Sequence, residues 1–211
     1  LLYHKKSKQN IQSSVESTKK KVLNDPREQG KYFTLSNDYP DIVFHKDLPP
    51  VILGEIVDAP YFEYAELKKK VQSYLDSGVQ IVDLGAVAGE NNAEFFIQTL
   101  PKLRKDFDVP FSVDSMNPEE IIAACEAGAK MILSVSFDNF KEIVHSPAVP
   151  KDVPIVLVPI SEKDTSEPEE RYNPENRIGL LMRLGNLMAS HGFTKILLDR
   201  KSTRLNSSHY S

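Results

Sequence analysis

From Pro50 onward, the chain alternates short apolar runs rich in β-branched residues with longer segments in which apolar residues recur every three to four positions. The short runs predict buried strands, and the three-to-four spacing predicts helices that pack one face on a sheet. Six strands are expected, at residues 51–57, 80–85, 111–114, 130–136, 153–160 and 195–199. Strands that alternate with helices in this way predict an α/β fold with a parallel sheet.

The helices between these strands carry recognisable start and stop residues. Asn117 followed by Pro118 predicts a helix N-terminus, with Glu120 completing a capping-box-like arrangement. Gly128 predicts the end of the same helix, because glycine readily adopts the left-handed conformation that follows a helix. The segment 173–192 repeats the Asn-Pro start and the glycine stop.

Apolar side chains on these helices are expected in the core rather than at a cofactor. Leu67 and Val71 have the spacing of a helix packed on a sheet, and Met182 and Met188 are expected to pack in the same way. The single cysteine, Cys125, cannot form an internal disulfide, so we expect a small buried hydrophobic residue rather than a nucleophile.

Composition narrows the class of protein. The chain has 211 residues, 40% hydrophobic and 27% charged, which suits one folded domain or one domain with a piece of another. Residues 1–31 carry eight Lys or Arg against three Asp or Glu, but no aromatic residues interleave the lysines as a nucleic-acid surface would require. We therefore expect a solvated helix or linker there and no nucleic-acid partner.

No apolar run approaches the roughly 20 residues that cross a bilayer, and the basic start lacks the apolar region of a signal peptide. We expect a cytoplasmic protein with no membrane partner.

The chain opens at Leu1, which suggests that it begins inside a larger protein. Residues 161–172 are expected to form a solvated acidic loop rather than a metal chelator. Residues 200–211 resemble a translated sequencing adapter and are expected to be a non-native tail. The adapter could also encode Asp199.

Polar residues lie at the ends of the predicted strands, where the loops of a βα-repeat protein hold ligands. The candidates are Glu55, Asp58, Asp83, Asp114, Ser134, Ser136, Asn139 and Asp199. Most are hydrogen-bond acceptors, and no glycine-rich phosphate loop follows any strand. Carboxylates in a partly desolvated pocket at the strand ends suit a ligand with several N–H donors in one plane, such as a guanidine-like or aminopyrimidine ring.

Several candidates also have a structural explanation. Asp58 could shape the turn before Ala-Pro, Asp83 could bond a loop amide, and Asn139 could cap the next helix. Asp114 is the strongest candidate, because Asn117 already supplies the helix cap downstream of it. The five histidines do not cluster at ligand spacing, so no metal ligands are predicted.

Three segments resemble a known family. "SGVQIVDLGAVAGE", "VPFSVDSMNPEEIIAACEAGAKMILSVS" and "GFTKILLD" are similar to the second, third-to-fourth and sixth strand segments of dihydropteroate synthases and other pterin-binding barrels. The likeness is strongest to archaeal dihydropteroate synthase-related proteins, in which "PPVILGEIVDAP" would open the barrel. It implies an incomplete TIM (β/α)8 barrel of about six βα units over residues 48–199, preceded by the remnant of an N-terminal domain in residues 1–47.

The resemblance also implies roles for single residues. Asp114 lies where the family places an aspartate against the pterin ring, and Asp199 where a second carboxylate binds the aminopyrimidine edge. The implied substrate-binding set is Asp114, Asp199, Asp83, Glu55, Asp58, Ser136 and Asn139. The implied small-molecule partner is a pterin, as ligand or substrate. No cofactor is firmly implied, and the family is compatible with Mg²⁺ and with a homodimer.

The sequence also departs from the family's motifs at positions that bear on function. "GEIVDAP" stands where the synthases carry an Asn-x-Thr-Pro-Asp-Ser-Phe loop, whose Asn helps hold the pyrophosphate and its magnesium. Leu133 and Ser134 stand where the synthases offer an Asn to the pterin, with Asn139 as a nearby substitute. The family's Lys and Arg on the seventh and eighth strands have no counterpart in this chain. Pterin recognition is therefore better supported than pyrophosphate chemistry, and the chain alone is expected to be inactive.

Three functions follow from the resemblance. The first is a transferase of folate or methanopterin biosynthesis that joins a dihydropterin pyrophosphate to an arylamine. The second is a pterin-dependent methyltransferase that acts with a corrinoid partner, since those barrels share the scaffold. The third is a non-catalytic pterin-binding protein. Fold alone does not choose among them.

Overall fold

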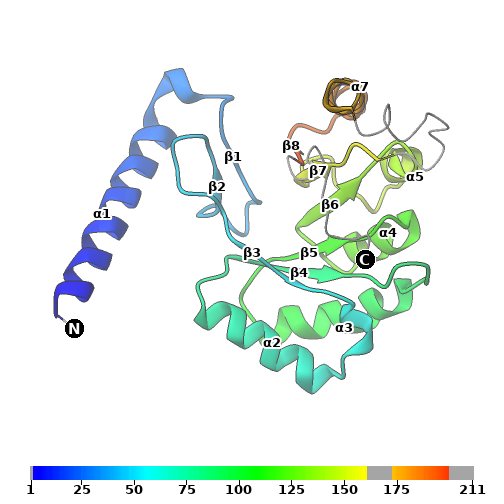
Figure 1. Ribbon diagram of the computed structural model, residues 1–211, viewed down its shortest axis with the longest axis horizontal. Helices are drawn as coiled ribbons and strands as arrows, with labels where there is room; N and C mark the ends of the chain where they lie inside the picture. The colour runs from blue at the N-terminus through cyan, green and yellow to red at the C-terminus, as the bar shows by residue number, and fades with distance from the viewer. Residues whose placement is uncertain (1, 161–172, 200–211) are drawn as a thin grey trace. The chain divides into compact units, whose positions relative to one another are not determined.

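The computed structural model describes residues 2–160 and 173–199, and the chain forms two compact units, residues 1–52 and 53–211 (Figure 1). The expected acidic loop at 161–172 and the expected tail at 200–211 lie outside the described residues. No described helix is both long enough and apolar enough to cross a bilayer.

The first unit pairs a long helix with a short hairpin. Its elements are α1 (Leu2–Asn24), the 3₁₀ helix η1 (Pro26–Glu28), β1 (Phe33–Thr34) and β2 (Val43–Phe44). The two strands are antiparallel, and the rings of Phe33 and Phe44 stack with centroids 4.8 Å apart. Lys19 of α1 pairs with Asp41 before β2 at 2.9 Å, which ties the helix to the hairpin.

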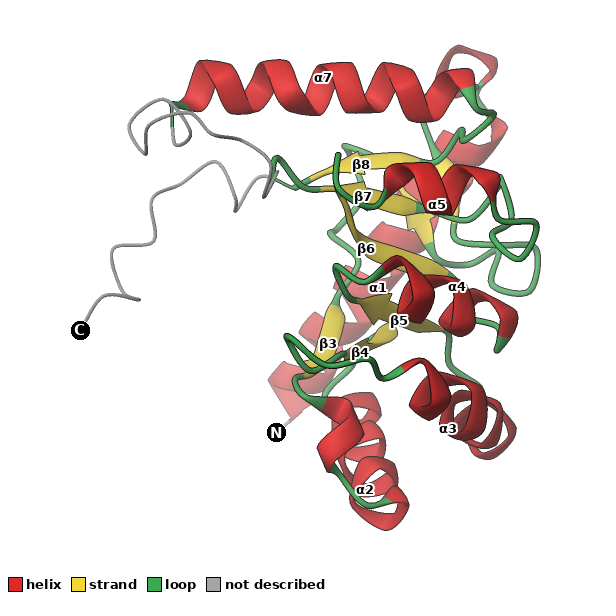
Figure 2. Ribbon diagram, turned by 90° about the vertical axis from the view of Figure 1, so that its right-hand side faces the viewer, coloured by secondary structure: helices red, strands yellow, loops and turns green. Residues whose placement is uncertain are grey.

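The second unit alternates strands and helices. Its elements are β3 (Leu53–Ile56), η2 (Ala59–Tyr61), α2 (Tyr64–Asp76), β4 (Ile81–Gly85), α3 (Ala93–Asp106), β5 (Phe111–Asp114), α4 (Pro118–Glu126), β6 (Met131–Val135), α5 (Phe140–His145), β7 (Ile155–Leu157), α7 (Pro174–Ser190) and β8 (Ile196–Leu198). The six strands are all parallel and follow one another in chain order from β3 to β8 (Figure 2). The predicted α/β fold and its six strands are confirmed.

The helices of this unit lie along the outside of the curved sheet, from α2 and α3 beside β3 and β4 to α7 beside β7 and β8 (Figure 1). On β4, Val82 and Leu84 belong to the core cluster shared with these helices, while Asp83 alternates with them and points to the other face. Burial of apolar helix stripes such as Leu67 and Val71 against the strands stabilises this layer.

The predicted helix boundaries are confirmed at α4. The Asn117 side chain accepts a hydrogen bond from the Glu119 N–H at 3.0 Å, Pro118 occupies the first turn, and Gly128 has a positive φ of 98° after the helix. The capping-box-like role of Glu120 is wrong, because its carboxylate is bonded elsewhere. The Ser115 hydroxyl and the Asn92 N–H donate to it instead.

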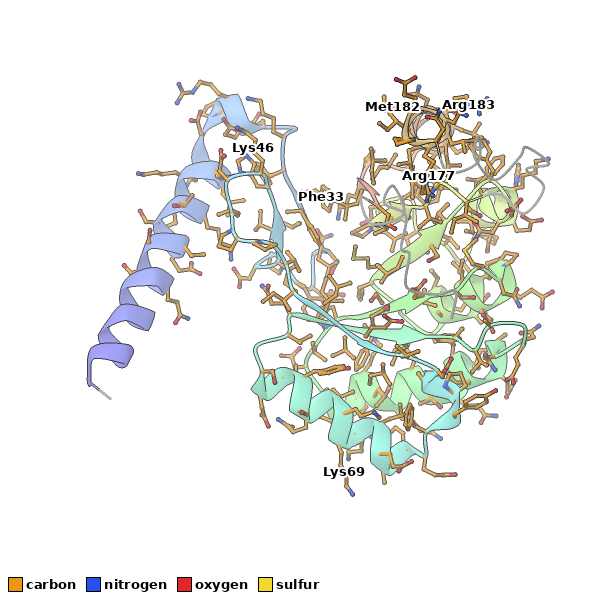
Figure 3. All side chains as sticks on the ribbon, in the orientation of Figure 1. Phe33, Lys46, Lys69, Arg177, Met182 and Arg183 are labelled. Carbon is orange, nitrogen blue, oxygen red and sulfur yellow. The ribbon has the colours of Figure 1, made fainter. Side chains whose placement is uncertain are left out.

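Helix α7 buries one stripe, formed by Arg177, Leu181, Leu184 and Met188. Met188 packs as expected, but the expectation for Met182 is wrong, since its side chain is 54% exposed. Met182 is one residue beyond Leu181, which rotates it by about 100° from the buried stripe. Figure 3 shows Arg177 on the sheet side of α7 and Met182 on its outer side.

Cys125 is a buried residue of α4, as predicted. Burial, with a smaller contribution from Glu126, raises the pKa of its thiol to about 12. The thiol therefore stays protonated and unreactive at neutral pH.

Gly54 of β3 sets how closely α2 approaches the sheet. A Cβ at this position would lie 2.8 Å from Cδ2 of Tyr74 and 3.0 Å from Cγ2 of Val79. Gly54→Ala should lower the free energy of unfolding by about 1–3 kcal/mol through overpacking, as measured by urea denaturation. Gly179→Ala is the matched control, because nothing lies within 4 Å of a Cβ there. It should stabilise α7 by up to about 1 kcal/mol. Equal stability of Gly54→Ala and the wild type would contradict this packing.

Candidate functional site

The pairing register of β3, β4 and β5 brings three carboxylates together. Glu55 pairs with Asp83 across β3 and β4, and Asp83 pairs with Ser112 across β4 and β5. Paired residues of a parallel sheet point to the same face, and so does Asp114, two residues after Ser112. One carboxylate oxygen from each of Glu55, Asp83 and Asp114 lies within 4.8 Å of the other two. We call these three residues the carboxylate cluster.

Asp83 lies at the buried base of the cluster and is 1% exposed. Its Oδ1 accepts a hydrogen bond from the Ser112 hydroxyl at 2.6 Å, whereas its Oδ2 is buried and has no hydrogen-bond partner among the described residues. Burial raises the pKa of Asp83 to about 8, opposed by the Ser112 hydrogen bond and increased further by the Asp114 and Glu55 carboxylates.

Asp114 is the last residue of β5 and is half-buried. The Ser134 hydroxyl of β6 donates a hydrogen bond to Asp114 Oδ1, which orients the carboxylate. Asn117 supplies the helix cap downstream, so the helix does not require an acid at position 114. Unlike Asp83, Asp114 lines an open pocket.

This pocket has a volume of about 320 Å³, at the lower end of the range of small-molecule sites. Its walls are the segments 85–90 and 114–117, and it is completed by Glu55 and Glu120. Twelve of the described residues line the pocket, and four of these are acidic while none is basic. The acids are Glu55, Glu90, Asp114 and Glu120. The pocket therefore suits N–H donors or cations rather than a bare anion.

Glu120 joins the two walls of the pocket, a role that the sequence did not predict. It is 1% exposed, and its Oε1 accepts from the Asn92 N–H at 2.5 Å. Its Oε2 accepts from the Ser115 hydroxyl, whose oxygen accepts in turn from the Asn117 N–H at 2.9 Å. The Asn92 side chain also accepts from the Val87 N–H at 2.9 Å, so the network runs from one pocket wall to the other.

The remaining predicted site residues lie outside the carboxylate cluster. Asp58 is exposed and has a left-handed backbone with φ 50°, before η2. Asp199 is half-buried after β8, and its N–H donates to the Leu157 carbonyl at 2.9 Å. Neither residue lines the pocket described above. Their contact with a ligand stays a prediction.

Ser136 and Asn139 are buried and bonded to each other. Asn139 Oδ1 accepts from the Ser136 N–H at 2.9 Å. Asn139 Nδ2 donates to the carbonyls of Ser134 and Met116, at 2.9 and 3.2 Å. Both amide hydrogens are thus used, one by the end of β6 and the other to hold the loop after β6 against the loop after β5. A direct ligand contact for either residue stays a prediction.

Comparison with known proteins shows the family to which this chain belongs. Residues 56–202 match the family described as "Pterin binding enzyme", and the chain belongs to this family. A relative in Methanocaldococcus jannaschii, described as an uncharacterized protein, is 37% identical over 152 residues, covering 72% of this chain and 28% of the relative. A dihydropteroate synthase of Synechocystis sp. is 26% identical over 100 residues, covering 43% of this chain and 35% of the enzyme.

Solved structures show the same fold. The dihydropteroate synthase of Vibrio fischeri superposes with a TM-score of 0.56 at 18% identity, over 75% of this chain and 63% of that one. The Burkholderia cenocepacia enzyme, complexed with 7,8-dihydropteroate, gives 0.57 at 14% identity, over 75% and 60%. The second unit is therefore an incomplete (β/α) barrel, as predicted, and the chain spans about a third or less of the curated relatives it matches.

The buried Asp83 predicts a pH-dependent stability. The pKa of Asp83 is about 8 in the folded chain, against 3.8 in the unfolded chain. Between these pH values the folded state keeps a proton that the unfolded state has released, so the free energy of unfolding falls as pH rises from about 4 to 8. Asp83→Asn keeps an acceptor for Ser112 and cannot ionise. In EDTA buffer, the unfolding free energy of Asp83→Asn minus that of the wild type should grow over this window, by at most about 1.4 kcal/mol per pH unit. A flat difference would contradict the buried, acid-surrounded environment.

Loss of the Glu120 carboxylate should loosen the pocket walls. Glu120→Ala leaves the half-buried Asn92 N–H and the buried Ser115 hydroxyl without their acceptor, at an expected cost of about 2–4 kcal/mol in urea denaturation. Hydrogen exchange should quicken in 86–92 and 115–117 before the rest of the sheet. Glu119→Ala is the control, because Glu119 is exposed and, among the described residues, its carboxylate accepts a hydrogen bond only from the Asn91 side chain. Equal effects of the two variants would exclude the proposed network.

Proposed function

We propose that this chain binds a pterin in the pocket beside the carboxylate cluster, with Asp114 accepting hydrogen bonds from the N–H groups of the ring. The observation that carries the proposal is the position of Asp114 at the tip of β5, where it lines the pocket and is oriented by Ser134. A carboxylate can accept two N–H bonds in one plane, which matches the edge of an aminopyrimidine.

The charge of the pocket supports a donor-rich ligand. Its acidic lining favours N–H groups and disfavours another anion, while Val87 and Met116 offer apolar contact to the faces of a flat ring. Membership of the pterin-binding family points to the same ligand class. We also propose that Asp199 gives the second carboxylate, as the likeness to the family implies, although it follows β8 and does not line this pocket.

For the whole protein, we propose a transferase that joins a dihydropterin pyrophosphate to an arylamine, in folate or methanopterin biosynthesis. The support is the likeness to dihydropteroate synthases. The residues described here would contribute binding and orientation of the pterin, which lowers the barrier by holding the reacting carbon in place. No side chain is required as a nucleophile.

The acidic lining also favours a second candidate. The described residues that line the pocket are acidic or uncharged, so a methyl-carrying pterin without a pyrophosphate suits their charge. A pterin-dependent methyltransferase acting with a corrinoid protein is therefore the alternative, and a non-catalytic pterin-binding protein is the third. Release of pyrophosphate when the full-length protein is incubated with a dihydropterin pyrophosphate and p-aminobenzoate would support the first, whereas binding without turnover would favour the other two.

Pterin binding is tested by titrating the full chain with 7,8-dihydropteroate in a calorimeter. Asp114→Asn should weaken binding by about tenfold or more, because an amide replaces a charged acceptor with a donor on one side. Asp152→Asn is the matched control, since Asp152 is exposed in the loop before β7 and should leave the affinity unchanged. Equal affinity of the Asp114 variant and the wild type would refute the assignment of Asp114.

A further inference from the structure

We propose that the carboxylate cluster binds one hard divalent cation, of the Mg²⁺, Mn²⁺ or Ca²⁺ class, through Glu55, Asp83 and Asp114. The sequence predicted these acids at one site, but assigned them to a ring with N–H donors, and it predicted no metal ligands because the histidines do not cluster. The three acids belong to different strands and are separated by 28 and 31 positions. The pairing register makes them neighbours. The site goes beyond the proposed pterin function and does not rest on it.

The separation of the oxygens fits a shared ion. Oxygens on opposite sides of Mg²⁺ are about 4 Å apart, and those on opposite sides of Ca²⁺ about 5 Å. The three cluster oxygens lie within 4.8 Å of one another, so they can reach one ion with small side-chain movements. The donors are all carboxylate oxygens, which favours hard cations over zinc or copper.

Asp83 gives the second and independent reason. Its Oδ2 is buried, has no hydrogen-bond partner among the described residues and belongs to the side chain at the base of the cluster. A buried carboxylate oxygen without a partner is costly, and a cation would satisfy it. Ser112 holds the other oxygen of the same carboxylate at 2.6 Å, as outer residues commonly do for metal ligands.

The strands hold the ligands in place. The Glu55 carbonyl accepts from the Tyr74 hydroxyl at 2.6 Å, which fixes the backbone of β3 at this point. Gly85 leaves space for the Glu55 side chain, since a Cβ there would lie 3.2 Å from Glu55 Oε1. Ser134 orients Asp114 from β6. The adjoining pocket leaves room for the water ligands that Mg²⁺ and Mn²⁺ retain.

The test is a titration of the EDTA-stripped full chain with Mn²⁺, followed by the loss of the EPR signal of the free ion. We expect one site per chain, displaced by excess Mg²⁺ or Ca²⁺. Asp83→Asn and Glu55→Gln should each weaken Mn²⁺ binding by about tenfold or more. Asp152→Asn is the matched control and should bind Mn²⁺ as the wild type does, because Asp152 is exposed in the loop before β7 and lies outside the cluster.

Absence of Mn²⁺ uptake by the wild type would overturn the proposal, and so would equal uptake by both cluster variants and the wild type. Glu55 is exposed, so Glu55→Gln should remain folded even where Asp83→Asn does not, and circular dichroism checks both. A parallel titration with 7,8-dihydropteroate in EDTA separates the two hypotheses. Pterin binding without Mn²⁺ uptake would refute the cation site alone, whereas Mn²⁺ uptake without pterin binding would support the cation site and refute the proposed function.

Discussion

The in-register parallel pairing of β3, β4 and β5 is the constraint on which the site depends. It places Glu55 beside Asp83 and Asp83 beside Ser112, so that acids far apart in the chain share one face and one level of the sheet. A shift of one residue on β4 would turn Asp83 toward the helices and Val82 or Leu84 toward the pocket. The apolar core that buries Val82 and Leu84 therefore also fixes where the carboxylates point.

The same arrangement has a cost, because three acids gather at a partly buried point and one of them loses contact with water. Desolvation, and to a smaller extent repulsion by Asp114 and Glu55, disfavours ionised Asp83, which is why its pKa is raised. Proteins commonly keep such unfavourable groups at sites that bind a ligand. Glu120 is also buried, but both of its carboxylate oxygens accept hydrogen bonds, and it links the pocket walls.

Local signals in the sequence were sufficient for the strands, the helix boundaries and the position of Asp114. The run "FSVD" ends at a strand tip and Asn117 begins the next helix, both of which depend only on near neighbours. The Glu120 network was missed because its partner Asn92 lies 28 residues away. Met182 was misplaced because one residue of helical phase separates a buried side chain from an exposed one.

The central claim is that the strand-end carboxylates face one pocket that takes the donor edge of a flat ring. A crystal structure of the intact protein with bound 7,8-dihydropteroate tests it most directly. The account predicts the pterin between the segments 85–90 and 114–117, with an Asp114 oxygen at about 2.7–3.2 Å from a ring N–H nitrogen. A pterin bound elsewhere on the chain, or one whose donor edge faces away from Asp114, would contradict it.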